Sequence, residues 1–157
     1  MSDAALSIGD PEPMMFSSEA ETRDFGQALA ACLCAGDWVS LIGPLGAGKT
    51  ALARSLIQAR LGPATEVPSP SYTLVNVYAG IPEIWHADLY RLSDPEEAEE
   101  LGLLDDLADR IVVAEWPERL GPSLPARRLE LRLDFDGEQG RLARLSRLGD
   151  WKLEGLS

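Results

Sequence analysis

The chain has 157 residues, a formal net charge of −12 and an apolar content of 45%. A chain of this length can bury a core large enough for one domain without disulfides or metals. No apolar run approaches the roughly 18 residues of a membrane span, and the N-terminus lacks a signal-peptide pattern. We therefore expect a cytoplasmic protein, and the negative charge disfavours direct binding of RNA or DNA.

The charge is unevenly distributed along the chain. Residues 94–109 carry eight acids and no base, whereas residues 127–147 carry six of the fourteen lysines and arginines. The acidic stretch is typical of a solvated helix, and it could also be a docking surface for a basic partner.

The N-terminal part predicts a loose leader followed by a single domain. Residues 1–16 contain glycine, prolines and scattered acids and read as a flexible leader, so residues 17–157 form the expected domain. Ser18 and Glu21 have the spacing of a capping box and predict a helix start, with Gly36 as a C-cap. The short apolar run 37–42 is typical of a buried parallel strand.

The middle of the chain alternates between helical and strand patterns. A helix is predicted over residues 49–61, where Gly62 and Pro63 end it. Residues 72–78 and 84–92 read as strands. Asp94 and the proline after it predict the start of an acidic helix that runs to about Leu101.

The C-terminal part predicts a buried strand and a hairpin. Residues 110–114 form an apolar run, and residues 129–135 and 141–148 alternate with glycines between them. Taken together, the elements predict an α/β fold. We expect a three-layer sandwich with a mixed, mostly parallel central sheet and a C-terminal antiparallel hairpin.

The segment from Gly43 to Thr50 matches the pattern G-x-x-x-x-G-K-[ST]. Glycines allow the backbone N–H groups to approach phosphate oxygens, and the following helix directs its positive end at the anion. Lys49 adds a charge for the β- and γ-phosphates, and Thr50 offers a hydroxyl to Mg²⁺. The alternative is a glycine turn with an incidental lysine, but the predicted strand before the loop and helix after it favour nucleotide binding and a P-loop NTPase-like fold.

Two carboxylates follow predicted strands and could hold Mg²⁺ directly or through water. Glu115 ends the apolar strand 110–114, and Asp88 lies within the run 84–92. Each could instead be a surface carboxylate that closes a strand. Glu115 is the better candidate for a metal ligand because a clean apolar strand precedes it.

Two further features have both structural and functional interpretations. Residues 69–73 are rich in hydroxyls and braced by proline, which suits either a γ-phosphate sensor or a plain turn. His86 is the only histidine in the chain, and we interpret it as a satisfied structural residue beside Asp88.

Several motifs in this chain occur together in one known family. They are GPLGAGKT at 43–50, SPSYTLV at 69–75, HADLYRL at 86–92, DPEEAEELG at 94–102 and EWPE at 115–118. In these motifs the chain resembles the TsaE (YjeE) ATPases, bacterial proteins required for making threonylcarbamoyladenosine in tRNA. The likeness extends over residues 18–133. The chain departs from the family pattern at Pro44, Ala51 and Ser71, and none of these changes removes a phosphate or metal group.

The resemblance implies ATP or ADP with Mg²⁺ as ligands and assigns roles to individual residues. Lys49, Asp88 and Thr73 would be catalytic, Thr50 and Glu115 would hold Mg²⁺, and residues 69–73 would act like a switch loop. The implied nucleotide-binding residues are Ser18, Glu19, Gly43, Leu45, Gly46, Ala47, Gly48, Lys49, Thr50, Ser71 and Trp116.

The resemblance also implies TsaB and TsaD as protein partners, with tRNA reached only through their complex. TsaD transfers the threonylcarbamoyl group, and the ATPase would reset the complex between turnovers. Two alternatives stay open. A small-molecule kinase would need a lid with arginines, but only Arg91 lies between Asp88 and Arg110. A nucleotide-sensing adaptor would need binding without hydrolysis.

Overall fold

The computed structural model describes residues 13–149. Its helices are α2 (Glu19–Cys32), α3 (Lys49–Leu61) and α4 (Pro95–Glu100), with 3-10 segments η1 (Leu107–Asp109) and η2 (Pro117–Ser123). Its strands are β1 (Met14–Phe16), β2 (Trp38–Ile42), β3 (Val75–Tyr78), β4 (Glu83–Asp88), β5 (Arg110–Glu115), β6 (Arg128–Asp136) and β7 (Gly140–Leu148). In this described part, no helix is both long and apolar enough to cross a membrane.

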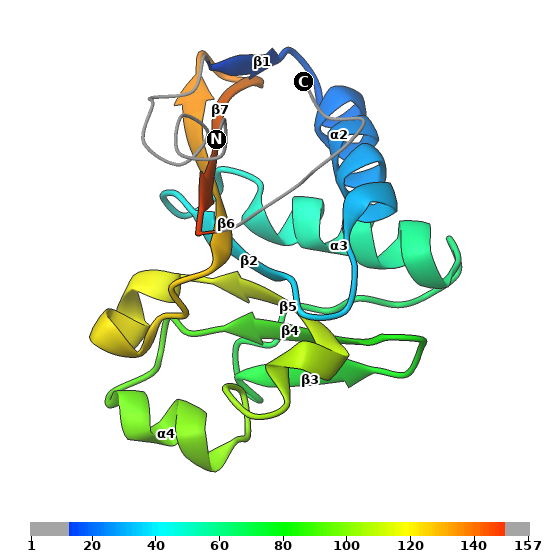
Figure 1. The fold of residues 1–157 in the computed structure, drawn as a ribbon. Coiled ribbons are helices and arrows are strands. Elements are labelled where there is room, and N and C mark those ends of the chain that lie inside the picture. The colour runs from blue at the N-terminus through cyan, green and yellow to red at the C-terminus, as the bar shows by residue number, and fades with distance from the viewer. Residues whose placement is uncertain (1–12, 150–157) are drawn as a thin grey trace.

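The described strands form one mixed sheet in the order β1-β7-β6-β2-β5-β4-β3 (Figure 1). Its centre is parallel, because β2 runs parallel to both β5 and β6, and β4 runs parallel to β5. The antiparallel pairs lie toward the two edges. The expected C-terminal hairpin is confirmed, since β6 and β7 pair from Arg128↔Leu148 to Asp136↔Gly140.

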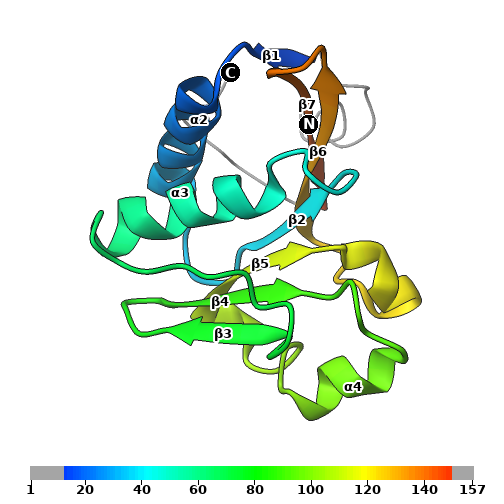
Figure 2. The same ribbon diagram turned by 180° about the vertical axis from the view of Figure 1, so that it is seen from behind.

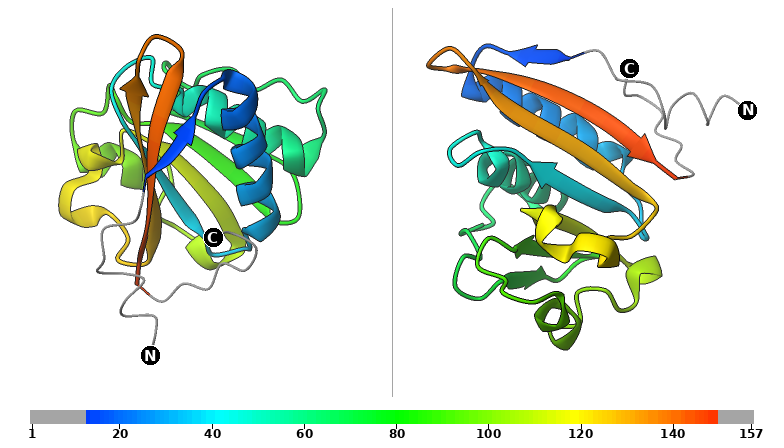
Figure 3. Two further views of the ribbon diagram at one scale, coloured as in Figure 1. Left: turned by 90° about the horizontal axis from the view of Figure 1, so that it is seen from above. Right: turned by 90° about the vertical axis from the view of Figure 1, so that its left-hand side faces the viewer.

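Side chains alternate between the two faces of the central strands, and each face has its own core. Val39 and Val113 belong to the cluster that packs under α2 and α3, whereas Trp38 and Val112 belong to the cluster that includes residues of α4 and η2. Figure 2 shows α2 and α3 packed together on the same side, with α4 on the other. The expected three-layer arrangement is therefore confirmed, and Figure 3 shows it from two further directions.

The two long helices begin and end with recognisable caps. The Ser18 hydroxyl accepts a hydrogen bond from the Glu21 backbone N–H, as the sequence predicts. The Glu21 carboxylate accepts from Ser17 instead of from Ser18, so only half of the capping box forms. Helix α2 ends at Cys32 with Leu33 as its C-cap, which makes the prediction of Gly36 wrong. The predicted limits of α3 are confirmed.

Three expected boundaries differ from the structure. The expected flexible leader reaches residue 16, but Met14–Phe16 form β1 and pair with β7, while residues 1–12 lie outside the described part. The expected strand 72–78 begins only at Val75, because a turn closed by the hydrogen bond from Leu74 N–H to Pro70 carbonyl precedes it. The expected strand 84–92 ends at Asp88, where the chain turns again.

Replacement of a buried leucine in α3 should destabilise the domain. Leu56 is 0% exposed in the core under the helices, so Leu56→Ala removes packed methyl groups and leaves a cavity. We expect the free energy of unfolding to fall by about 2–5 kcal/mol in urea titrations followed by circular dichroism. Leu45→Ala is the control because Leu45 is 66% exposed, and it should change stability by less than about 0.5 kcal/mol. Equal effects of the two changes would contradict this core.

Candidate functional site

The loop between β2 and α3 follows a backbone path that favours glycine, as Gly43 and Gly48 illustrate. A Cβ atom at Gly43 would collide with the backbone carbonyl oxygen of Leu133 on β6. Gly48 caps α3 with a φ of 105°, which L side chains rarely adopt. The loop therefore lies tightly against the sheet and delivers the N-terminus of α3, with its unpaired N–H groups and positive dipole end, to the carboxyl edge of β2.

Lys49 is buried in the first turn of α3, with only 5% of the residue exposed. Its ammonium donates to the backbone carbonyls of Gly43 and Pro44 and lies 3.7 Å from the ring centroid of Trp116. Burial lowers the pKa of Lys49, and the negative charges of three nearby carboxylates oppose that shift in part. The ammonium is thus held at the cavity by contacts within the chain.

Glu115 forms a short chain of contacts with α3 and β4. Its Oε1 atom accepts a hydrogen bond from the Thr50 hydroxyl at 2.9 Å, and its Oε2 atom lies 2.7 Å from Nε2 of His86. Glu115 is 2% exposed and His86 is fully buried. His86 is buried, as expected of a structural residue, but its partner is Glu115 instead of Asp88, and its Nδ1 atom has no hydrogen-bond partner among the described residues.

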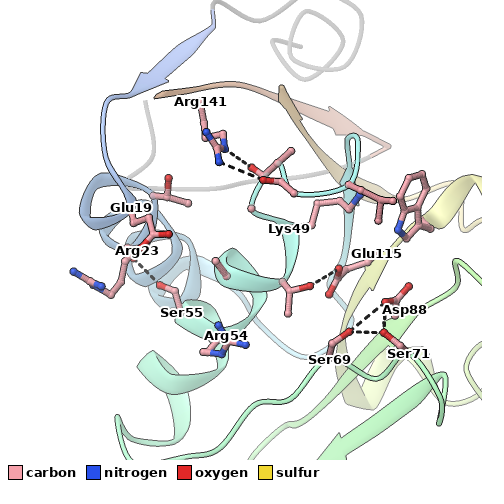
Figure 4. Close-up of a pocket in the computed structure, with 18 of the residues that line it drawn as sticks. Glu19, Arg23, Lys49, Arg54, Ser55, Ser69, Ser71, Asp88, Glu115 and Arg141 are labelled. Carbon is pink, nitrogen blue, oxygen red and sulfur yellow. Dashed lines mark hydrogen bonds between the residues drawn. The ribbon is translucent and has the colours of Figure 1, made fainter. Parts of the chain in front are cut away.

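Asp88 ends β4 directly beside Glu115, its register partner at the end of β5. Parallel strands end at the same edge, so these two carboxylates meet at the loop. The Oδ1 atom of Asp88 accepts from the Tyr90 backbone N–H at 3.1 Å. Its Oδ2 atom accepts long hydrogen bonds of 3.4 Å from the hydroxyls of Ser69 and Ser71, as Figure 4 shows.

Trp116 follows Glu115 with a left-handed backbone, at φ 57° and ψ 48°. This conformation costs a non-glycine residue about 1–2 kcal/mol. The indole ring contacts the Lys49 ammonium and packs against Tyr90, with ring centroids 4.9 Å apart. These contacts favour the backbone geometry that turns the ring toward the loop.

Most of the predicted site residues line one cavity of about 550 Å³ (Figure 4). The predicted residues that line it are Glu19, Leu45, Gly46, Ala47, Gly48, Lys49, Thr50, Ser71, Asp88, Glu115 and Trp116. Ser18 lines a neighbouring hollow, which shares Glu19, Arg23, Gln139 and Arg141 with the cavity. Gly43 does not line the cavity, and the hydroxyl of Thr73 donates to Asn76 at 2.9 Å instead of lying among the lining residues.

Sequence reasoning missed several polar residues of the cavity wall, among them Arg23, Arg54 and Arg141. Arg141, on β7, donates to the backbone carbonyls of Ala47 and Gly46 at 3.1 and 3.3 Å. Arg54 donates to the Val67 carbonyl at 3.2 Å. The excess of arginines over residues 127–147 was the available signal for Arg141, but it did not distinguish that residue from its neighbours.

The residues present fit a magnesium–polyphosphate ligand. The buried Lys49, the arginines of the cavity wall and the N-terminus of α3 suit the phosphates. The hydroxyl of Thr50 and the carboxylate of Glu115 lie within hydrogen-bond distance of each other and are oxygen ligands of the kind that Mg²⁺ prefers. A site with two protein oxygens also suits this ion, which keeps several of its waters.

The parallel strands around β2, the tight glycine loop and the helix after it define a P-loop-like protein of the α/β class. The family model described as "Threonylcarbamoyl adenosine biosynthesis protein TsaE" matches residues 16–143. The chain belongs to the TsaE family.

Individual relatives agree with this assignment. The chain is 37% identical over 134 residues to a Rickettsia bellii protein named tRNA threonylcarbamoyladenosine biosynthesis protein TsaE, covering 84% of this chain and 92% of the relative. Proteins with the same name from Mycobacterium bovis and Streptomyces coelicolor are 42% identical, over 73% and 71% of this chain and 73% and 78% of theirs. The crystal structure of Bacillus subtilis YdiB has the same fold, with a TM-score of 0.74 at 24% identity, covering 88% of this chain and 86% of that one.

Lys49 should titrate below an ordinary lysine, whose pKa is 10.5. The chain has one other lysine, so Lys152→Arg leaves Lys49 as the only lysine signal in NMR spectra of ¹³C-lysine-labelled protein. Between the folded and unfolded pKa values the unfolded chain binds more protons, so the free energy of unfolding rises with pH through that window as the cost of burying the Lys49 charge is relieved. The same label in urea-unfolded chain is the control. A folded midpoint at or above the unfolded one would contradict the burial of this ammonium.

Proposed function

We propose that this protein is a cytoplasmic, magnesium-dependent ATPase that acts with TsaB and TsaD in forming threonylcarbamoyladenosine at position 37 of tRNAs. Its hydrolysis step resets the complex between turnovers. Membership of the TsaE family supports the place in this tRNA modification. The observation that carries the ATPase assignment is that Lys49, the pair Thr50–Glu115 and Asp88 all line the same cavity.

The chain binds the phosphates through the first turn of α3. The N–H groups there have no helical partner, and Lys49 adds a full positive charge beside them. Because the ammonium is largely excluded from water, its attraction to a phosphate is screened less than at the surface. Entry of a phosphate therefore exchanges the carbonyl partners of Lys49 for a charged acceptor.

Thr50 and Glu115 would hold the metal through their oxygens. Bound Mg²⁺ would neutralise charge on the β- and γ-phosphate oxygens. The carboxylate of Glu115 is already oriented toward the Thr50 hydroxyl, so the two ligands need little rearrangement.

Asp88 acts on the nucleophile. Its carboxylate lies at the end of β4, beside the metal carboxylate, and the Ser69 and Ser71 hydroxyls surround its Oδ2 atom at hydrogen-bond distance. A carboxylate in this place orients a water molecule and accepts its proton. Ser69 and Ser71 lie in the loop before β3. The position of their hydroxyls can therefore change with the presence or absence of the γ-phosphate.

The surface chemistry supports the indirect role toward tRNA. A net charge of −12 opposes a polyanion, and the acidic segment that includes α4 adds to that repulsion. Contact with the partner proteins, by contrast, requires no neutralisation of phosphates.

Removal of the Asp88 charge should separate binding from hydrolysis. In Asp88→Asn the phosphate-binding loop is intact, so ATP affinity measured by calorimetry should stay within about threefold, while phosphate release falls by about 10²–10⁴-fold. Asp105→Asn, at an exposed acid outside the cavity, is the control and should hydrolyse ATP like the parent. Transfer of phosphate to a metabolite in place of water would favour a kinase instead.

The place in tRNA modification is tested by reconstitution with TsaB, TsaD, tRNA and an activated threonylcarbamoyl donor, scored as threonylcarbamoyladenosine formed per complex. With the parent protein and ATP, repeated turnover is expected. If this protein or ATP is left out, the reaction should stop near one product per complex. The partners should also stimulate ATP hydrolysis. If Asp88→Asn supported full modification, nucleotide binding alone would be sufficient and the adaptor function would replace the ATPase.

A further inference from the structure

His86 is a buried polar residue that the proposed hydrolysis does not use directly. It lies on β4 and is 0% exposed, and it is the only histidine in the chain. Its Nε2 atom lies 2.7 Å from Oε2 of Glu115, and its Nδ1 atom has no hydrogen-bond partner in the described residues. All the polar interaction that the structure gives this ring is therefore directed at one carboxylate oxygen.

The strand register places the ring behind the carboxylate. His86 is the register partner of Val113 on β5, two residues before Glu115, so their side chains share one face of the sheet. This face packs under α3, which carries Thr50. The ring contacts Oε2 while the Thr50 hydroxyl contacts Oε1, and the two oxygens of Glu115 are thus distinguished by their partners.

The direction of the hydrogen bond follows from the acceptor. A carboxylate oxygen can only accept, so Nε2 carries the hydrogen and donates it. In the neutral ring Nδ1 is then a bare acceptor, so no buried N–H group is left without a partner. The ring consequently serves as a donor with a single target.

We propose that His86 is a positioning residue for the metal: by holding Oε2 of Glu115, it keeps Oε1 directed at Thr50 and available to Mg²⁺. This inference rests on the proposed magnesium site at Thr50 and Glu115. Without His86, the carboxylate of Glu115 keeps only its contact with Thr50, so its orientation must be fixed when the ion binds, at a cost in conformational entropy. Loss of a partner behind a metal ligand typically lowers metal affinity by about 10–100-fold.

Two amide substitutions test the role of the donor. His86→Gln places an amide N–H near the position of Nε2 and keeps the contact with Glu115. His86→Asn places its amide near Nδ1 instead, too far back to reach that carboxylate. Both variants bury a neutral amide of similar polarity, so they are matched for the cost of burial.

The readout is ADP affinity, measured by calorimetry on the full chain in excess Mg²⁺ and in EDTA. We expect Mg²⁺ to strengthen ADP binding in both the parent and His86→Gln. The factor by which it does so should agree between the two proteins to within about threefold. In His86→Asn the strengthening should shrink by about tenfold or more, with ADP affinity in EDTA unchanged. Equal strengthening in all three proteins, or equal loss in both variants, would overturn the role of the donor. A parent that binds ADP equally with and without Mg²⁺ would overturn the proposed metal site itself.

A second measurement needs no substitution and covers the case of a variant that does not fold. Because the chain has one histidine, ¹⁵N NMR of untagged, histidine-labelled protein gives one pair of ring signals. We expect a protonated Nε2 and a bare Nδ1, with the Nε2 signal shifting more on addition of Mg²⁺–ADP than of ADP in EDTA. An unprotonated Nε2 would overturn the proposal. So would an Nε2 signal that shifts equally with Mg²⁺–ADP and with ADP in EDTA.

Discussion

A concentration of positive charge at one helix end sets the constraints on the rest of this structure. The N-terminus of α3 and the ammonium of Lys49 meet at the carboxyl edge of β2, in a chain whose net charge is −12. The loop that delivers them lies so close to β6 that a side chain at Gly43 would strike the Leu133 carbonyl. The pairing of β2 with β6 therefore determines the geometry of the loop as much as the glycines do.

The parallel centre of the sheet brings acids to the same edge, where they would repel one another without partners. Asp88 and Glu115 are neighbours at the ends of β4 and β5. Each carboxylate is held by its own hydrogen bonds, Asp88 by a backbone N–H and two serine hydroxyls, and Glu115 by Thr50 and His86. The buried Lys49 charge lies close enough to both acids that they oppose the lowering of its pKa. The site thus combines one buried cation with two separately anchored anions.

The fold class, the hairpin and the limits of α3 could be predicted from the sequence because glycines, prolines and apolar periodicity are local signals. The strand before the loop and the strand that ends at Glu115 follow from the same signals. What the sequence could not reveal depends on pairing across long separations. The contact of Arg141 with the loop arises only because β7 folds back beside β6 and carries its arginine to residue 47. The partner of His86 likewise depends on the register between β4 and β5.

The left-handed backbone at Trp116 limits the substitutions that this position tolerates. Glycine would relieve the local strain, yet it would also remove the aromatic surface that the Lys49 ammonium faces. Asparagine tolerates the dihedral angles but offers no ring to stack on Tyr90. Substitutions that reduce the backbone strain at residue 116 thus remove the aromatic ring beside the Lys49 ammonium. Local stability and the geometry of the site therefore favour different residues at this position.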